Sequence, residues 1–327
     1  MPSTFGSNTF GGIEKDQTYN YYRTRIPGLI MKIVKERIYP LIHLNCPPDI
    51  NCQYCINVPQ SPALLKLKSS VFKTLNDVSQ YNDDFRNILV NDHNIILHLI
   101  HLLIQFASQS QLDKKTDSQE QHDQQQSESS SSLSLITQSL DLLDRLINNN
   151  NNNRKVVINT PNALHSLSTL TNYKINIHFS QEMDKQTFKV RHSSRWCLFY
   201  IQEQGDASVY SELVKARYVG VLVIAISTAG GTGEEKDDEI RDQLFLISEF
   251  IRSLNQGRNY NATFPPQPLL VRRSDEQIEE EGGNEEVDSQ LINKGDYGHI
   301  KDHANRAKEW ILNYFIEQDN PRPRWYN

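Results

Sequence analysis

Apolar residues recur at helical spacing in several separate segments of the chain, and polar turns divide these segments. The three most apolar segments predict helices at residues 95–106, 163–170 and 219–226. A shorter, half-apolar segment precedes each of them, at residues 85–92, 153–159 and 209–215. The pattern predicts an all-α fold in which one group of helices recurs along the chain.

Fixed offsets bring the three copies into register without gaps. One column falls at a turn between helices and holds Asn82, Asn150 and Asp206, which are 68 and 56 residues apart. Another column, predicted to be buried, holds Phe72, Leu140 and Trp196. Removing a polar insert at 109–132 and a polar stretch at 171–186 leaves repeats of about 44 and about 40 residues, a length typical of helical repeat units.

The segment Asn153-Arg154-Lys155-Val156-Val157 resembles the armadillo repeat, in which a small polar turn and an Asn-Arg-x-x-Ile/Val motif lead into a long third helix. The resemblance covers roughly residues 20–254 and implies an armadillo-like right-handed helical solenoid. The glycine that usually precedes the third helix is absent from all three units. This departure leaves HEAT-like or irregular helical stacking open.

Low-complexity stretches divide the chain into four expected regions. Residues 1–19 are expected to be disordered, and residues 20–254 to form the repeats, with a long disordered Gln/Ser-rich insert at 109–132. Residues 255–293 contain an acidic cluster and are expected to form a flexible loop. Residues 294–327 are expected to contribute a helix that caps the stack, at 299–317, followed by a tail.

A polar stripe on the first apolar helix is the most informative surface feature. Asn94, His98, His101 and Gln105 are spaced by four, three and four residues, which places them on one helical face. The same offset places Asn162, Ser166 and Thr169 on the next unit, and Lys32 and Lys35 take the matching positions near the N-terminus. The resemblance to armadillo proteins implies that these residues line a groove for an extended segment of a partner protein. The alternative is that the stripe is the solvated side of a surface helix.

Four possible metal ligands lie close together in the sequence, at His43, Cys46, Cys52 and Cys55. Thiolate and imidazole groups are the ligands that structural zinc sites use. Only one Cys-x2-Cys pair is present, so the alternative is that the cysteines of this linker are incidental. Zinc is therefore a possible cofactor, and we expect no other.

Lys189, Arg191, His192 and Arg195 form a basic cluster at the start of a predicted helix. Its first interpretation is a solvated helix face. The second is a binding site for an acidic segment, such as residues 275–288 of the same chain.

Charge and hydropathy exclude several classes of function. The chain carries a net charge of −6 and residues 274–288 carry −8, so the rest carries only +2, which argues against a dedicated nucleic-acid-binding protein. The longest apolar run, Val219 to Ile226, is too short for a membrane span. Residues 1–12 lack the pattern of a signal peptide, so we expect a cytoplasmic or nuclear protein.

No spacing of residues indicates a catalytic arrangement, so we expect no enzyme. The sequence predicts a non-enzymatic scaffold or adaptor that binds a protein segment. The alternative function is a zinc-stabilised interaction module built on His43 and the three neighbouring cysteines.

Overall fold

The computed structural model describes residues 32–80, 82–113, 122–148, 150–175, 177–178, 180–228, 235–292 and 299–312. Over these residues the protein contains 14 packed α-helices and no strands, so the prediction of an all-α fold is confirmed. Two isolated bridges, Leu44 with Ile56 and Arg258 with Phe264, pair short loop segments. The predicted disordered N-terminus lies outside the described residues.

The elements follow one another in a regular order of long and short helices. They are η1 (Val34–Ile38), α3 (Tyr39–Ile42), η2 (Pro48–Ile50), α4 (Pro62–Ser79), α5 (Asp83–Asn91), α6 (Ile95–Asp113), α7 (His122–Ile147), α8 (Asn151–Asn159), α9 (Ala163–Leu170), α10 (Gln181–Gln204), α11 (Ala207–Lys215), α12 (Tyr218–Ile226), α13 (Asp237–Gln256), α14 (Pro268–Glu280), α15 (Gly283–Gln290) and α16 (His299–Leu312).

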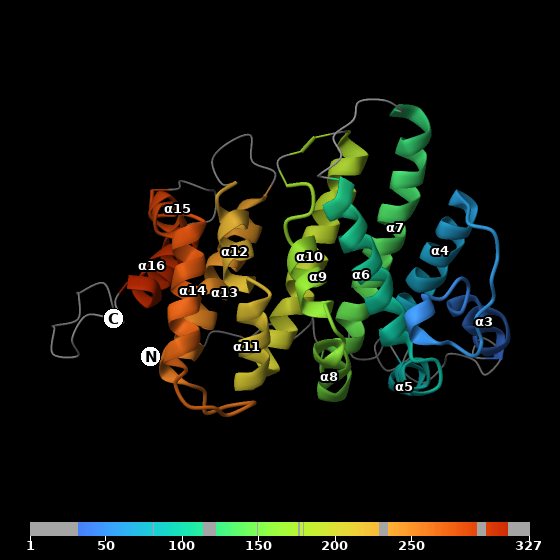
Figure 1. Cartoon of the computed structure of the whole chain (residues 1–327), viewed down its shortest axis with the longest axis horizontal. Helices are drawn as coiled ribbons and strands as arrows, with labels where there is room; N and C mark the ends of the chain where they lie inside the picture. The colour runs from blue at the N-terminus through green and yellow to red at the C-terminus, as the bar shows by residue number, and fades with distance from the viewer. Residues whose placement is uncertain are drawn as a thin grey trace, which may run out of the picture.

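From α4 onward the helices group in threes. The first helix of each group packs against the first helix of the next, so that α4, α7, α10, α13 and α16 form one row. The third helices form a second row in which α6 contacts α9, α9 contacts α12, and α12 contacts α15. Figure 1 shows the groups following one another along the long axis of the molecule. The described residues therefore form four three-helix units from α4 to α15, and α16 packs against the last of them.

One turn of the unit is capped in the same way three times. The side-chain oxygens of Asn82, Asn150 and Asp206 accept hydrogen bonds from backbone N–H groups at the first turns of α5, α8 and α11. Such caps satisfy donors that a helix cannot pair internally. The column of turn residues found in the sequence is therefore a column of N-caps.

The next turn of each unit requires a left-handed residue. Asn94, Asn162 and Arg217 adopt positive φ angles of 48°, 64° and 58° immediately before α6, α9 and α12. The fourth unit has Gly282 at this place, with φ 68°. Glycine has no Cβ to clash in this conformation, and asparagine tolerates it better than most residues. The glycine missing from the three predicted units thus occurs in a unit that the sequence pattern did not reveal.

Arginines bind the carbonyl groups at the ends of three of the long helices. Arg86 donates to Ser79 O at the end of α4, and Arg154 donates to Ile147 O at the end of α7. The third unit has Tyr210 at the position equivalent to Arg86 and Arg154. There, Arg258 from the segment after α13 binds the carbonyl oxygen atoms of Gln202, Glu203 and Gly205 instead. The last carbonyls of a helix have no internal partner, so each arginine satisfies them.

The acidic segment is helical, which corrects the expectation of a flexible loop over 255–293. Within it, α14 and α15 pack against α12 and α13. The reason is a sparse apolar stripe, since Val271, Ile278 and Val287 are buried while the carboxylates lie mainly on other faces. One carboxylate pair, Glu280 and Glu281, binds Arg217.

Two other expectations also change. The insert expected to be disordered at 109–132 is helical at both ends, since α6 extends to Asp113 and α7 begins at His122. Residues 114–121 lie outside the described part. In the predicted buried column, Phe72 and Leu140 are buried, but Trp196 is only half-buried. The α10 side chains that enter the core beside it are Cys197 and Leu198. The predicted capping helix is present as α16 up to Leu312.

Candidate functional site

The predicted polar stripe does not form one accessible surface. On α6 and the residue before it, Asn94 and Gln105 are exposed, His101 is half-buried, and His98 is only 5% exposed. His101 faces Asp49, with Nδ1 and Oδ2 3.8 Å apart. His98 is therefore internal, contrary to its expected place on a solvent-facing groove.

The matching residues of the other units are also divided between surface and interior. Asn162 is exposed, Ser166 is buried, and the Thr169 hydroxyl accepts a hydrogen bond of 3.1 Å from Gln111 of α6. Lys32 and Lys35 are exposed, and Lys32 lies 3.8 Å from Glu36. A groove on this face remains a prediction for Asn94, Gln105 and their exposed counterparts alone.

A cleft lies elsewhere, between the long helices α10 and α13, which contact each other far less than α7 contacts α10 or α13 contacts α16. Its volume is about 170 Å³. Its apolar lining comes from Trp196, Phe199, Phe245 and Leu246. Arg195, Glu239, Asp242 and Gln243 supply the polar lining. The cleft therefore combines aromatic walls with a small number of polar groups, as ligand sites do.

An aromatic series runs along α10 into this cleft. Phe188, His192, Trp196 and Tyr200 are spaced by four residues, so they share one helical face. Consecutive ring centroids are 6.0, 6.2 and 6.0 Å apart, and all four side chains are half-buried. Phe199 adds an edge contact with Trp196 at 5.3 Å. This face of α10 thus presents aromatic surface that the protein only partly covers.

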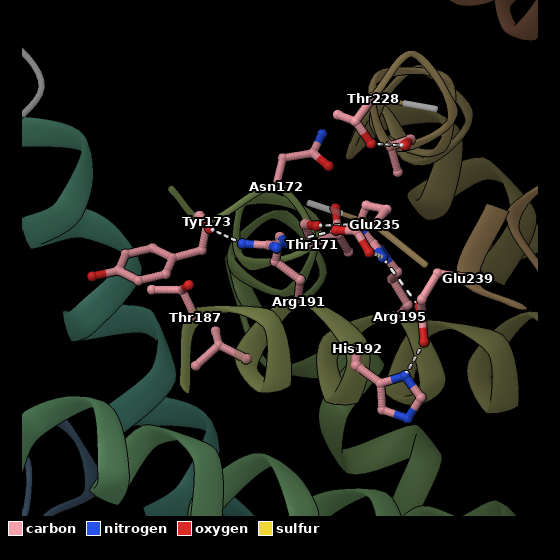
Figure 2. A network of polar contacts seen from close by, with 12 residues as sticks. Thr171, Asn172, Tyr173, Thr187, Arg191, His192, Arg195, Thr228, Glu235 and Glu239 are labelled. Atoms are coloured by element: carbon pink, nitrogen blue, oxygen red, sulfur yellow. Dashed lines mark hydrogen bonds and ion pairs between the residues drawn. The ribbon is translucent and has the colours of Figure 1, made fainter. Parts of the chain in front are cut away.

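Two residues that line the cleft, Arg195 and Glu239, belong to a buried ionic network (Figure 2). The Glu235 carboxylate accepts hydrogen bonds from Arg191 at 2.7 Å and from Arg195 at 2.9 Å. All three side chains are at most 2% exposed. Arg191 also donates to the backbone oxygen atom of Tyr173, and Arg195 to that of Thr171, so both arginines bind the segment that follows α9.

The basic cluster found in the sequence therefore has two kinds of member. Arg191 and Arg195 are buried and paired with carboxylates of the segment at 235–239, not with residues 275–288. Lys189 remains nearly half exposed and pairs with Asp141 of α7. The interpretation as a solvated helix face is wrong for the two arginines. Their shared partner, Glu235, lies about 40 residues away along the chain, where helix periodicity could not reveal it.

Two residues that line the cleft each have one buried side-chain atom without a hydrogen-bond partner within the described part of the protein. These atoms are the Nε donor of Arg195 and the Oε1 acceptor of Gln243, whose residues are each only 2% exposed. A buried polar group without a hydrogen bond costs about 1–3 kcal/mol.

His192 pairs with Glu239 of the cleft, and this pair makes the stability of the protein depend on pH. The hydrogen bond to Glu239 raises the pKa of His192 above its ordinary value of 6.5, although burial opposes the shift. Burial raises the pKa of Glu239, but the hydrogen bonds and charges of His192 and Arg195 together outweigh it and leave that pKa lowered.

We expect His192→Gln to destabilise the protein more at about pH 6 than at about pH 8. The pKa of His192 is higher in the folded state, so its stabilising contribution is complete below the unfolded value and is lost as pH rises through the folded one. The His192 side chain is 40% exposed, so the difference is under about 1 kcal/mol. Urea unfolding of both proteins across this range measures it, and a difference that grows with pH would contradict it.

The predicted metal ligands do lie together, but one of them is replaced. The donor atoms of His43, Cys46, Cys52 and His98 all lie within 4.8 Å of one another. Cys55 stands just outside this group, and its Sγ accepts a hydrogen bond of 3.2 Å from the Cys46 backbone N–H. The fourth member of the group is His98 of α6. The sequence did not reveal it as a ligand, because it is far from the cysteines along the chain.

Burial sets the protonation state of this cluster. Burial, assisted by the nearby charge of His43, lowers the pKa of His98 to about 4, and burial also lowers the pKa of His43. The pKa of Cys46 is raised by burial and by its neighbours Cys52 and Cys55. The imidazoles are therefore neutral at physiological pH, which is the form that binds metal ions.

Within the described ranges, no single helix has the length and apolar content needed to cross a bilayer. One bent pair, Asp83–Asn91 with Ile95–Gln111, satisfies the criterion together, at an angle of 66°. Compared with known protein families and with curated proteins, the sequence matches none.

Proposed function

We propose that this protein is a non-enzymatic scaffold that binds a segment of another protein, and that its helices form an armadillo-like right-handed solenoid. The grouping of helices in threes, the repeated N-caps and the repeated left-handed turn support the proposed architecture. In such a stack each unit contacts only its neighbours, and one face of the row is left for partners.

The cleft between α10 and α13 is the observation that carries the proposal. Half-buried aromatic side chains are the residues that protein interfaces use as anchoring sites, and a pocket between them accepts an apolar side chain of the partner. The occupant we propose is therefore a peptide segment with an aromatic or aliphatic anchor that enters this cleft.

Peptide selection tests this function directly. We expect a phage-displayed random peptide library, selected against the full chain, to yield peptides that share an apolar anchor. Trp196→Ala and Phe245→Ala should each weaken their binding by at least about tenfold, or about 1.4 kcal/mol, in fluorescence anisotropy.

Ile292→Ala is the matched control, because this apolar side chain is 80% exposed and does not line the cleft. It should leave binding unchanged. Peptides whose affinity depends on Asn94 and Gln105, and not on Trp196, would place the site on the groove predicted from the sequence. Failure to select any binding peptide would contradict the scaffold function itself.

A further inference from the structure

A second site lies at the N-terminal end of the row, where the loop after α3 folds against α6. His43 ends α3, Cys46 and Cys52 follow in the loop, and His98 projects from α6. His43 and His98 are buried, and their rings meet edge to face at 5.1 Å. Side chains from two distant segments thus converge on one point.

We infer that His43, Cys46, Cys52 and His98 bind one zinc ion in a tetrahedral site that fastens this loop to α6. The proposal is independent of the cleft and of the function proposed for it. It differs from the set predicted by the sequence, because His98 takes the fourth position and Cys55 stands beside the site.

The distances fit this coordination. Zinc–sulfur and zinc–nitrogen bonds of about 2.3 and about 2.0 Å place tetrahedral donors about 3.3–3.8 Å apart. All four donors already lie within 4.8 Å of one another, and His43 Nδ1 is 3.2 Å from Cys52 Sγ. Small side-chain rotations would bring them to bonding distance. Two thiolates and two neutral imidazoles would balance the charge of Zn²⁺.

The surroundings of His43 also fit. Its Nδ1 faces Cys52, while its Nε2 lies 3.1 Å from Nδ1 of His93. A histidine that binds metal through one nitrogen usually donates its other N–H to a neighbouring acceptor, which fixes the ring. His93 can accept this hydrogen bond and is therefore a positioning residue for the first ligand.

The backbone of the loop is already held in shape. Asn45 N donates to Ile56 O at 2.9 Å, and Ile56 N donates to His43 O at 2.8 Å. Lys68 of α4 donates to Leu44 O at 2.9 Å. The loop that carries the cysteines is thus closed on itself and attached to α4, so metal binding need not order it. This preorganisation favours a specific site over chance clustering of thiols.

Cobalt binding tests the donor set. The reduced full chain, stripped of metal with a chelator, should bind one Co²⁺ and develop the visible bands of tetrahedral coordination with thiolate charge transfer. Cys52→Ser and His98→Gln should abolish these bands. Cys55→Ser should keep them, as should Cys197→Ser, which removes a buried thiol of α10 far from the site. His93→Ala should keep their shape but lower affinity about 10–100-fold.

The zinc-loaded wild-type chain provides a measurement that no folding defect can obscure. X-ray absorption should give two sulfur and two nitrogen ligands. Three sulfurs and one nitrogen, or loss of the cobalt bands in Cys55→Ser but not in His98→Gln, would overturn the assignment of His98. Absence of stoichiometric binding by the wild-type chain would overturn the site as a whole.

Discussion

Replacing Glu235 by glutamine is expected to lower the free energy of unfolding by about 3–5 kcal/mol. The carboxylate of Glu235 is the shared partner of Arg191 and Arg195, and all three side chains are almost fully buried. The amide leaves two guanidinium charges in a low-dielectric interior with one fewer counter-charge, which costs far more than the lost hydrogen bonds alone. Urea denaturation followed by circular dichroism at neutral pH measures the change.

Glu280→Gln is the control for this experiment. It also removes a carboxylate from an arginine pair, but Glu280 and Arg217 are both about half exposed to solvent. Exposed pairs contribute only about 0–1 kcal/mol. Equal effects of the two substitutions would mean that the Glu235 network is hydrated and is not the buried structure described above.

Replacing Phe250 by alanine should destabilise the protein by about 3–5 kcal/mol. The ring is fully buried on α13, stacks on Tyr210 of α11 at 4.8 Å and meets Tyr218 of α12 edge-on at 5.3 Å. Its removal leaves a cavity between the third and fourth units that rigid helices cannot close. Thermal and urea unfolding should both report the loss.

Trp196→Ala serves as the comparison for this second experiment, since it truncates a larger aromatic ring that stays half exposed. The cost should be clearly smaller than for Phe250, because much less apolar surface is removed from water when Trp196 folds. A larger loss of stability for Trp196→Ala than for Phe250→Ala would mean that Trp196 is buried, as the sequence pattern predicted.

The parts of the fold that the sequence could predict are those fixed by local chemistry. Asn82, Asn150 and Asp206 were found as one column because an N-cap needs a short polar acceptor at one position relative to its helix. The left-handed turn was harder to find, because asparagine (Asn94, Asn162) or arginine (Arg217) occupies it where glycine was expected.

The fourth unit was missed because its composition hides its pattern. The acidic residues of α14 and α15 outnumber the apolar ones, and the average polarity of the segment indicates a loop. Three apolar positions, Val271, Ile278 and Val287, are enough to hold these helices because α12 and α13 supply most of the apolar surface. Segment averages cannot show this, since the contribution of the neighbours enters only in three dimensions.

The candidate sites divide along the same line. His43, Cys46 and Cys52 are close in sequence, so spacing alone brought them together, whereas His98 joins them only through the packing of α6. The cleft depends on how α10 packs beside α13, which no periodicity encodes. The sequence signal for the cleft was the aromatic residue at every fourth position on the helix face that carries Trp196.

Arg258 has a consequence for the order in which the chain can fold. Three carbonyl groups at the end of α10 accept hydrogen bonds from Arg258, a residue that follows α13. During synthesis from the N-terminus, the third unit therefore emerges with an incomplete helix end and must wait for the fourth. The first two units carry their own arginines and can complete themselves as they leave the ribosome. The first two units can therefore fold more independently than the third and fourth. Truncation of the chain after α12 would remove Arg258, which binds the carbonyl groups at the end of α10.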